Sequence, residues 1–124
     1  MTLAPSYTLR LDAETWSTPA LAPGRIVAAD RSGLVRAFTE TGHAAWEVRT
    51  GAEITASPTL ASLPEPTILI GDHAGTFLAL DLATGAERWR QSFGAMIRAT
   101  AAFTDLDGEL GIWLPVYGPR LVRL

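Results

Sequence analysis

The sequence predicts an all-β fold built from about three copies of a four-stranded antiparallel unit. Three observations support it. The chain repeats itself, since Gly33 precedes Gly75 by 42 positions and Trp46 precedes Trp89 by 43. Short apolar runs recur between turns rich in Gly, Asp and Pro, as in all-β proteins. No segment keeps a 3.6-residue apolar period, so helices are not expected.

The repeat becomes clear when the chain is laid on itself. The segment from Ile26, IVAADRSGLVRAFTETGHAAW, matches the segment from Ile68, ILIGDHAGTFLALDLATGAERW. At the start, YTLRL from Tyr7 aligns without a gap on WEVRT from Trp46, and near the end DLDGELGIWLPVYGPRLVRL restarts the pattern. The spacing falls within the range of about 40 to 50 residues that is typical of propeller blades.

Each repeat is expected to divide into four strands. The first, and innermost, covers about 15–21, 53–60 and 96–103 in the successive repeats. A Gly-containing turn separates the second and third strands, and a Thr-Gly turn leads to a fourth that starts near the tryptophan. Residues 68–70 and 77–80 are apolar with almost no alternation, which predicts that both faces are buried. A β-propeller blade lies between two neighbours and meets this condition.

One segment also carries a family resemblance. ALDLATGAERW, residues 79–89, is similar to the tryptophan docking motif of the quinoprotein-like (PQQ-like) β-propeller repeats, and AFTETGHAAW, residues 37–46, is a near copy with Thr39 in place of the aspartate. The resemblance implies that these residues join adjacent blades and have a structural role. The motif residues are Ala37, Gly42 and Trp46 in the first copy and Ala79, Asp81, Gly85 and Trp89 in the second.

The resemblance also bears on cofactors. Quinoprotein dehydrogenases bind pyrroloquinoline quinone and a metal through residues spread over a longer, eight-bladed chain, whereas most proteins with these repeats are scaffolds, assembly factors or sensors. Three repeats cannot form that whole cofactor site in one chain. We therefore expect no cofactor, and a fragment of a quinone-dependent dehydrogenase is the least favoured interpretation.

Composition excludes several partners and chemistries. The 124 residues carry a net charge of −3 and no long basic run, so a nucleic acid partner is not expected. No cysteine is present, which excludes disulfides, thiolate metal sites and a lipid anchor on cysteine. No apolar stretch could span a membrane, and the first residues do not resemble a signal peptide. We expect a cytoplasmic protein, unless the sequence is trimmed. The basic residues are all arginine, as is typical of GC-rich bacteria.

An acidic turn offers one candidate metal site. In FTDLDGELGIWL, the side chains of Asp105, Asp107 and Glu109 could supply oxygen ligands to calcium, which prefers several such ligands at close spacing. The alternative is a β-turn in which an aspartate begins the turn and Gly108 takes the left-handed position. We favour the turn, because one copy without a later carboxylate does not complete a calcium loop.

Three blades cannot close a ring, since propellers have about four to eight blades. The segment from Tyr7 to Leu11 resembles a fourth strand without its own blade, and the last repeat lacks a fourth strand. This favours a homodimer in which the N-terminal strand of each copy completes the last blade of the other, giving a six-bladed ring. The alternative is that the chain is a fragment of a longer propeller.

A binding site is expected at the central channel, where the innermost strands converge. Aligning these strands brings Trp16, Thr55 and Arg98 to one position, two residues after Glu14, Glu53 and Met96. Side chains that differ between otherwise similar repeats are typical of a site placed on a repetitive frame. The alternative is that they only fill or solvate the channel.

Catalytic motifs such as GxSxG, HExxH or a Walker loop are absent. His43 and His73 fall in expected turns, and we interpret them as solvated. The favoured function is therefore a non-catalytic module that binds a protein or a small ligand at the channel. The alternative is a small enzyme whose pocket is assembled from two copies, with Trp16, Glu53 and Arg98 around an anionic or aromatic substrate.

Overall fold

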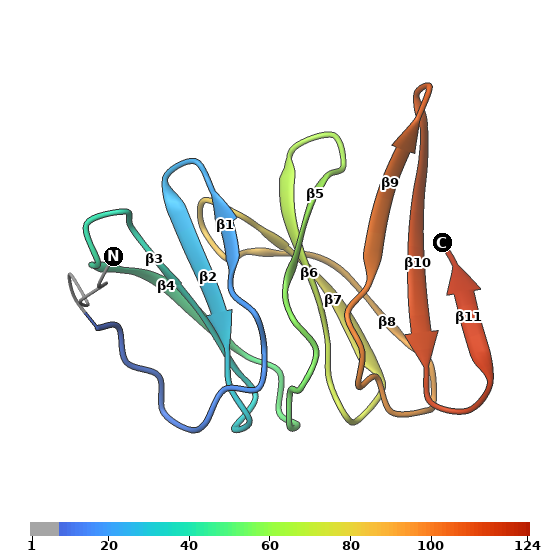
Figure 1. The fold of residues 1–124 in the computed structure, drawn as a ribbon, viewed down its shortest axis with the longest axis horizontal. Helices are drawn as coiled ribbons and strands as arrows, with labels where there is room; N and C mark the ends of the chain where they lie inside the picture. Colours follow the sequence, from blue (N-terminus) through green and yellow to red (C-terminus); the bar gives the residue numbers. More distant parts are fainter. Residues whose placement is uncertain (1–7) are drawn as a thin grey trace, which may run out of the picture.

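The computed structural model describes residues 8–124, which form eleven strands in three separate antiparallel sheets and no helix. The sheets stand side by side along the long axis of the molecule, in the order blade 1, blade 2 and blade 3 (Figure 1). None of the described residues forms a helix able to cross a bilayer. The all-β, blade-like architecture expected from the sequence is confirmed.

Blades 1 and 2 each have four strands in sequential order. Blade 1 consists of β1 (Ala20–Ala22), β2 (Arg25–Ala29), β3 (Leu34–Phe38) and β4 (Ala44–Arg49). Blade 2 consists of β5 (Thr59–Ser62), β6 (Pro66–Gly71), β7 (Thr76–Asp81) and β8 (Glu87–Ser92).

Blade 3 has three strands within the described residues: β9 (Ala102–Leu106), β10 (Glu109–Val116) and β11 (Arg120–Arg123). The expected absence of a fourth strand is confirmed here. The first strands of the three blades are neighbours, because β5 contacts both β1 and β9. They are the inner strands of the stack.

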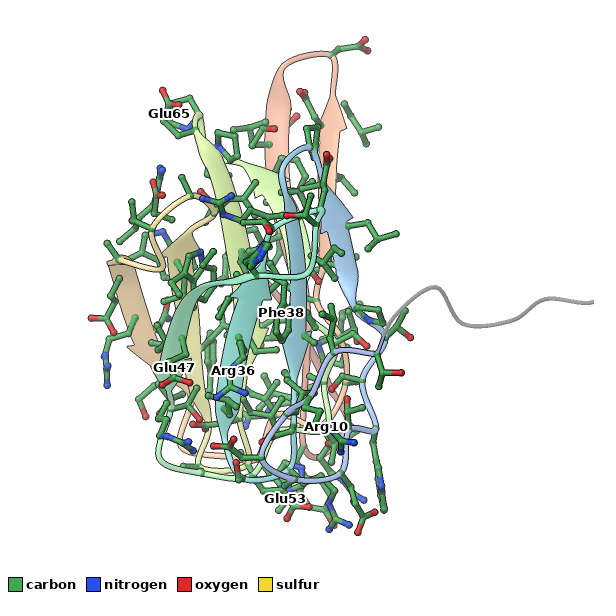
Figure 2. All side chains as sticks on the ribbon, turned by 90° about the vertical axis from the view of Figure 1, so that its left-hand side faces the viewer. Arg10, Arg36, Phe38, Glu47, Glu53 and Glu65 are labelled. Atoms are coloured by element: carbon green, nitrogen blue, oxygen red, sulfur yellow. The ribbon has the colours of Figure 1, made fainter. Side chains whose placement is uncertain are left out.

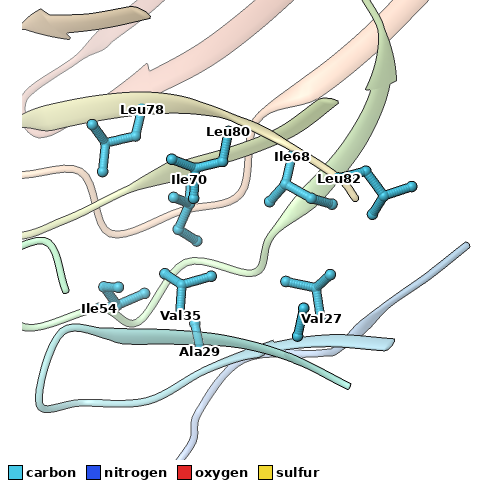
Figure 3. Packing of buried hydrophobic residues seen from close by; sticks show 10 residues of the cluster. Val27, Ala29, Val35, Ile54, Ile68, Ile70, Leu78, Leu80 and Leu82 are labelled. Carbon is cyan, nitrogen blue, oxygen red and sulfur yellow. The ribbon is translucent and has the colours of Figure 1, made fainter. Parts of the chain in front are cut away.

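The blades are held together by apolar side chains that alternate between the two faces of each sheet. In the first cluster, Val27 and Val35 of blade 1 face Ile68, Ile70 and Leu80 of blade 2 (Figure 3). In the second, Leu69 and Phe77 from the other face of blade 2 pack against blade 3. Strands β6 and β7 are thus buried on both faces, which confirms the expectation from their uninterrupted apolar sequence.

The inner strands begin later than the sequence suggested. The ranges 15–21, 53–60 and 96–103 were expected to be strands, but β1, β5 and β9 start at Ala20, Thr59 and Ala102. Pro19 and Pro58 stand directly before two of these strands, and a proline cannot donate the ladder hydrogen bond that would extend them. We call the preceding stretches, residues 12–19, 51–58 and 94–101, the lead-in segments.

The structure tests only part of the fourth strand that was expected from Tyr7 to Leu11. Tyr7 lies outside the described residues, and residues 8–11 form no strand. They lie instead beside the outer face of blade 1, where the Arg36 guanidinium donates to the carbonyl oxygen of Arg10 at 3.0 Å and contacts Glu47 (Figure 2). The pairing of this segment with a second copy therefore stays a prediction.

Candidate functional site

The lead-in segments and the turns after β2, β6 and β10 lie at one end of the stack, which we call the lead-in face (Figure 1). One backbone hydrogen bond recurs there in every blade, always at 2.8 Å, from the N–H of a turn residue to a lead-in carbonyl oxygen. The three pairs are Arg31 with Glu14, His73 with Glu53, and Tyr117 with Met96. The backbone is thus constant at six positions, while the side chains differ from blade to blade.

Polar side chains at these positions form a chain that crosses from blade 1 to blade 2. The Arg31 guanidinium pairs with one oxygen of Glu53. The other Glu53 oxygen lies 3.6 Å from Nδ1 of His73. On the far side of the ring, Nε2 of His73 lies 2.8 Å from the hydroxyl of Thr55. The imidazole is therefore fixed between a carboxylate and a hydroxyl, and it is largely buried.

Trp16 lies beside this chain and is 62% exposed. The guanidinium carbon of Arg31 is 4.1 Å from the centre of its ring, which is close enough for a cation–π interaction. The indole N–H donates to Glu14 at 3.4 Å. These contacts hold a large aromatic surface in place at the end of the molecule.

Of the four site residues predicted from the sequence, the structure brings three together. Trp16, Glu53 and Thr55 share the polar chain or contact it. Arg98 joins only through its backbone, because its carbonyl oxygen accepts from Thr55 at 3.2 Å. Its side chain is exposed and makes no hydrogen bond or ion pair with the described part of the chain. All four precede the inner strands instead of lying on them.

Two residues of this cluster were missed from the sequence. Arg31 was not considered, and His73 was interpreted as a solvated turn histidine, which is wrong because its side chain is packed between Glu53 and Thr55. Aligning the turns DRSG and DHAG would have shown that Arg31 and His73 occupy one position. His43, in contrast, is exposed as expected.

The buried aspartates of the same turns, Asp30 and Asp72, have a structural role. Asp30 accepts hydrogen bonds from the N–H groups of Ser32, Leu34, Asp12 and Ala13. Burial alone raises the pKa of Asp30, but the hydrogen bonds outweigh it and hold the pKa below 3.8. Asp72 accepts from its own turn through one oxygen, while its buried second oxygen has no hydrogen-bond partner in the described part of the chain.

The docking motif joins blade 1 to blade 2. The indole N–H of Trp46 donates to the carbonyl oxygen of Leu82 at 2.8 Å. Its ring lies so close to Gly85 that a Cβ there would be 2.6 Å from two ring carbons. Ala37 lies opposite Trp46 in the ladder between β3 and β4, as Ala79 lies opposite Trp89 in the next blade. This agrees with the structural role that the family resemblance implied.

Within the second motif copy, Asp81 closes the turn before β8. One oxygen accepts from the N–H groups of Ala83 and Thr84, and the other accepts from Arg88. The Arg88 guanidinium is the main cause of the lowered pKa of Asp81. In the first copy, Thr39 accepts from the His43 N–H, and Gly42 has the positive φ of 88° that the turn requires.

The acidic segment proposed as a calcium loop is the turn of the β9–β10 hairpin. Asp105 accepts a hydrogen bond from the Gly108 N–H, and Glu109 pairs with Arg123. Asp107 and Gly108 both have positive φ, at 54° and 81°. Among residues 8–124, no group of three or more His, Cys, Asp or Glu side chains is placed to hold a metal ion.

Two shallow hollows lie at opposite ends of the stack. One, of about 270 Å³, is on the lead-in face between Glu14, Arg31 and Glu53. The other, of about 320 Å³, lies on the hairpin side between blades 1 and 2, where the side chains of Arg25, Asp81 and Arg88 line it. Both hollows are open to solvent, so any binding here takes place on an open surface.

Comparison with known proteins establishes the family. A family described as outer membrane protein assembly factor BamB matches residues 4–116. The chain belongs to this PQQ-like, BamB-type repeat family. BamB from Moraxella catarrhalis superimposes on 99% of the chain with a TM-score of 0.81 and 24% identity. The β-propeller domain of Cps50 (Swd1) from Myceliophteria thermophila matches 96% with a TM-score of 0.66 and 16% identity.

The chain spans only part of each relative. It covers 35% of the BamB chain and 40% of the Cps50 chain. Two curated relatives, both called beta-alanine-activating enzyme, share 38% identity over 61 residues in Mus musculus and 34% over 64 residues in Danio rerio. The chain covers 6% of either enzyme. The similarity is limited to the repeat, and it does not assign the activities of those proteins to this chain.

Proposed function

We propose that this chain is a non-catalytic binding module of the BamB-type repeat family and that its partner binds to the lead-in face. The observation that carries the proposal is the contrast between constant backbone and variable side chains at this face. The same backbone hydrogen bond recurs three times, while the turn residue changes from Arg31 to His73 to Tyr117. A repeated fold whose side chains vary at one end is suited to carry a binding site there.

The chemistry of the face favours a protein partner over other ligands. Tryptophan and arginine are the side chains most enriched at the energetic centres of protein interfaces. Trp16 presents an exposed ring that Arg31 and Glu14 keep in position, so little side-chain freedom is lost on binding. Arg98, whose guanidinium pairs with no group among residues 8–124, adds a positive charge to this face. The family description, a protein assembly factor, also agrees with a partner that is a protein.

A selection from a random-peptide phage library on the wild-type chain tests the proposal. Binding of the selected peptides is then measured by fluorescence anisotropy against Trp16→Ala. We expect an affinity loss of about tenfold or more, as for truncation of an interface hot spot. Leu106→Ala is the matched control, because Leu106 is an exposed apolar residue at the end of β9, and the β9–β10 hairpin lies at the opposite end of the molecule from the lead-in face (Figure 1). Equal binding to wild type and Trp16→Ala contradicts the proposal.

One observation favours the alternative, a small enzyme. Glu53, His73 and Thr55 are arranged in the order of carboxylate, imidazole and hydroxyl that activates a nucleophile in acyl transfer. The rate of p-nitrophenyl acetate hydrolysis tests it. A rate above that of free imidazole, lost in both Thr55→Ala and His73→Gln, supports the enzyme. A rate that Thr55→Ala leaves unchanged speaks for the binding module.

A further inference from the structure

The hollow of about 320 Å³ on the hairpin side, which we call the hairpin-side hollow, lies between blades 1 and 2. It is lined by the turns between β1 and β2, β5 and β6, and β7 and β8. These turns are tied together, since the Leu82 N–H donates to the carbonyl oxygen of Pro66 at 3.1 Å and the Arg25 guanidinium donates to that of Ala83. All of the lining residues fall within residues 23–88, so blades 1 and 2 form this hollow by themselves.

The Arg25 guanidinium carries a positive charge that no carboxylate of the described chain neutralises. Its Nη1 donates to the carbonyl oxygen of Gly24 at 2.7 Å, and its Nη2 donates to that of Ala83 at 3.1 Å. Its Nε is buried and has no hydrogen-bond partner among residues 8–124. Charged groups that leave water are generally paired with an opposite charge, and two neutral carbonyl oxygens do not supply one. The hollow therefore has a positively charged wall that can take an anion.

Arg88 adds hydrogen-bond donors to the same hollow. Its Nη2 donates to Asp81 at 2.6 Å, and the two side chains form a neutral pair. Its Nε and Nη1 donate to no group in the described part of the chain. An arginine presents five N–H donors in a planar fork that matches the two oxygens of a carboxylate. Arg88 can thus hold Asp81 and still donate to a bound anion.

Neither arginine belongs to the repeated part of the fold. Alignment of the repeats places Thr67 of blade 2 at the position of Arg25, and Ala45 of blade 1 at the position of Arg88. Thr67 is buried, and its hydroxyl donates within its own turn to the carbonyl oxygen of Glu65 at 2.8 Å. The repeat therefore folds without an arginine at either position, as expected for side chains that serve a site at one junction.

One acidic side chain at the hollow opposes an anion. Glu65 belongs to the lining but forms no ion pair with Arg25 or Arg88. It stands in the β5–β6 turn at the edge of the molecule and is exposed (Figure 2). Water and salt screen an exposed charge, whereas Arg25 is half-buried. The charges around the hollow thus favour a ligand group with a single negative charge over a phosphate dianion.

We propose that the hairpin-side hollow binds a carboxylate group, with Arg25 supplying the opposite charge and Arg88 a further hydrogen bond. Because the hollow is open, it admits a free carboxylic acid or a carboxylate that projects from a polypeptide. The hollow lies at the opposite end of the stack from the lead-in face (Figure 1), so its occupancy is independent of the binding role proposed for that face.

Titration followed by nitrogen-15 NMR tests the site, because the Nε–H signals of arginine side chains report on it directly. The probes are the acetylated and amidated tripeptide Gly-Glu-Gly, its uncharged counterpart Gly-Gln-Gly, and sodium acetate. We expect Gly-Glu-Gly to shift the Nε–H signals of Arg25 and Arg88 to saturation, and Gly-Gln-Gly to leave them unchanged. Acetate that saturates at the same concentration as Gly-Glu-Gly assigns the site to free acids. Tighter binding of Gly-Glu-Gly assigns it to polypeptides.

A pair of arginine variants locates the binding. Arg25→Gln removes the charge and the fork, so it should weaken Gly-Glu-Gly binding at least about fivefold. Arg98→Gln is the matched control, because Arg98 also forms no ion pair with residues 8–124 but belongs to the lead-in face. It should bind as wild type does. Since Arg25 also donates to Ala83, both variants must give the wild-type circular dichroism spectrum in the far ultraviolet.

A second variant tests the site without removing a contact of the fold. The Glu65 side chain makes no hydrogen bond or ion pair within the described residues, so Glu65→Gln should fold as wild type does. Removal of its screened charge should tighten Gly-Glu-Gly binding about twofold. Asp107→Asn removes the same charge from the exposed hairpin turn of blade 3 and should leave the affinity unchanged.

Four results would overturn the inference. The first is an equal shift with Gly-Glu-Gly and Gly-Gln-Gly, which would mean that the carboxylate is not recognised. The second is wild-type affinity in folded Arg25→Gln, which would mean that Arg25 only joins the turns of two blades. The third is an equal loss in Arg98→Gln, which would mean a response to net charge. The fourth is tighter binding of inorganic phosphate than of acetate. Loss of peptide binding in Trp16→Ala at the lead-in face would leave this site unaffected.

Discussion

The two blade interfaces of this chain use the same apolar packing but differ in the docking of their tryptophans. Between blades 1 and 2, Trp46 donates its N–H to Leu82 and lies against Gly85. At the interface of blades 2 and 3, Trp89 borders the second apolar cluster but packs on Phe77 of its own blade, with ring centres 5.8 Å apart, and its N–H donates to no residue of the described chain. Apolar packing thus suffices to set blades side by side, and docking adds a directional contact to it.

The largest expected effect concerns the apolar clusters, which tests whether the two interfaces unfold together. Leu80→Ala in the first cluster and Leu114→Ala in the second each remove a fully buried side chain and should cost about 3 kcal/mol. Urea unfolding followed by fluorescence and by circular dichroism measures this. If the stack is one cooperative unit, both variants shift a single transition. A second transition in Leu114→Ala alone would show that blade 3 unfolds separately.

A somewhat smaller effect is expected at Gly85, where docking and backbone conformation coincide. Gly85→Ala places a Cβ 2.6 Å from the Trp46 ring at a φ of 76°, so we expect a loss of about 2 kcal/mol in unfolding free energy. Gly24→Ala is the control, since Gly24 has a similar φ of 80° but open space around it. The difference between the two variants isolates the contact with Trp46. Equal losses would mean that the ring moves away without cost.

The hydrogen bond of the docking tryptophan is expected to contribute less. Trp46→Phe keeps an aromatic ring but removes the donor to Leu82, and should cost about 1 kcal/mol beyond the change in packing. Trp89→Phe removes a donor that has no acceptor in residues 8–124, so only the packing change applies. Equal losses in urea unfolding would contradict the contrast between the two interfaces.

The repeat made most of this fold predictable. Trp46 and Trp89 marked the period, and the uninterrupted apolar runs in β6 and β7 showed which strands lie between two neighbours. The strand starts were not predictable in the same way, because Ser-Pro and Thr-Pro were interpreted as part of the inner strands. In the structure these residues use their hydroxyl and N–H groups to bond the next blade, as Thr18 does with Ser57.

The candidate site was only partly visible in the sequence for a related reason. Trp16 and Glu53 stood out because repeat alignment compares equivalent positions in different blades. The contact of Arg31 with Glu53 instead joins different repeat positions in neighbouring blades, and the cation–π contact of Arg31 with Trp16 joins different repeat positions within blade 1. A period gives the spacing along the chain, whereas such contacts depend on the rotation between blades and on side-chain length.

The smallest effect on stability is expected at low pH, and it should distinguish the two buried turn aspartates, Asp30 and Asp72. The pKa of Asp30 is lowered below its ordinary value of 3.8, so its ionised form stabilises the fold fully above about pH 3.8 and loses this contribution as the pH falls through the folded pKa. Asp30→Asn should therefore lose less stability than wild type between about pH 5 and pH 3, although it is less stable at neutral pH. The urea midpoint, measured across this pH range, gives the dependence of stability on pH.

Asp72→Asn is the comparison, because Asp72 accepts only two of the N–H groups of its own turn, whereas Asp30 also binds the lead-in segment at Asp12 and Ala13. If the urea midpoint of Asp30→Asn falls with pH as much as that of wild type, the bonds to the lead-in segment persist when the carboxyl group is protonated.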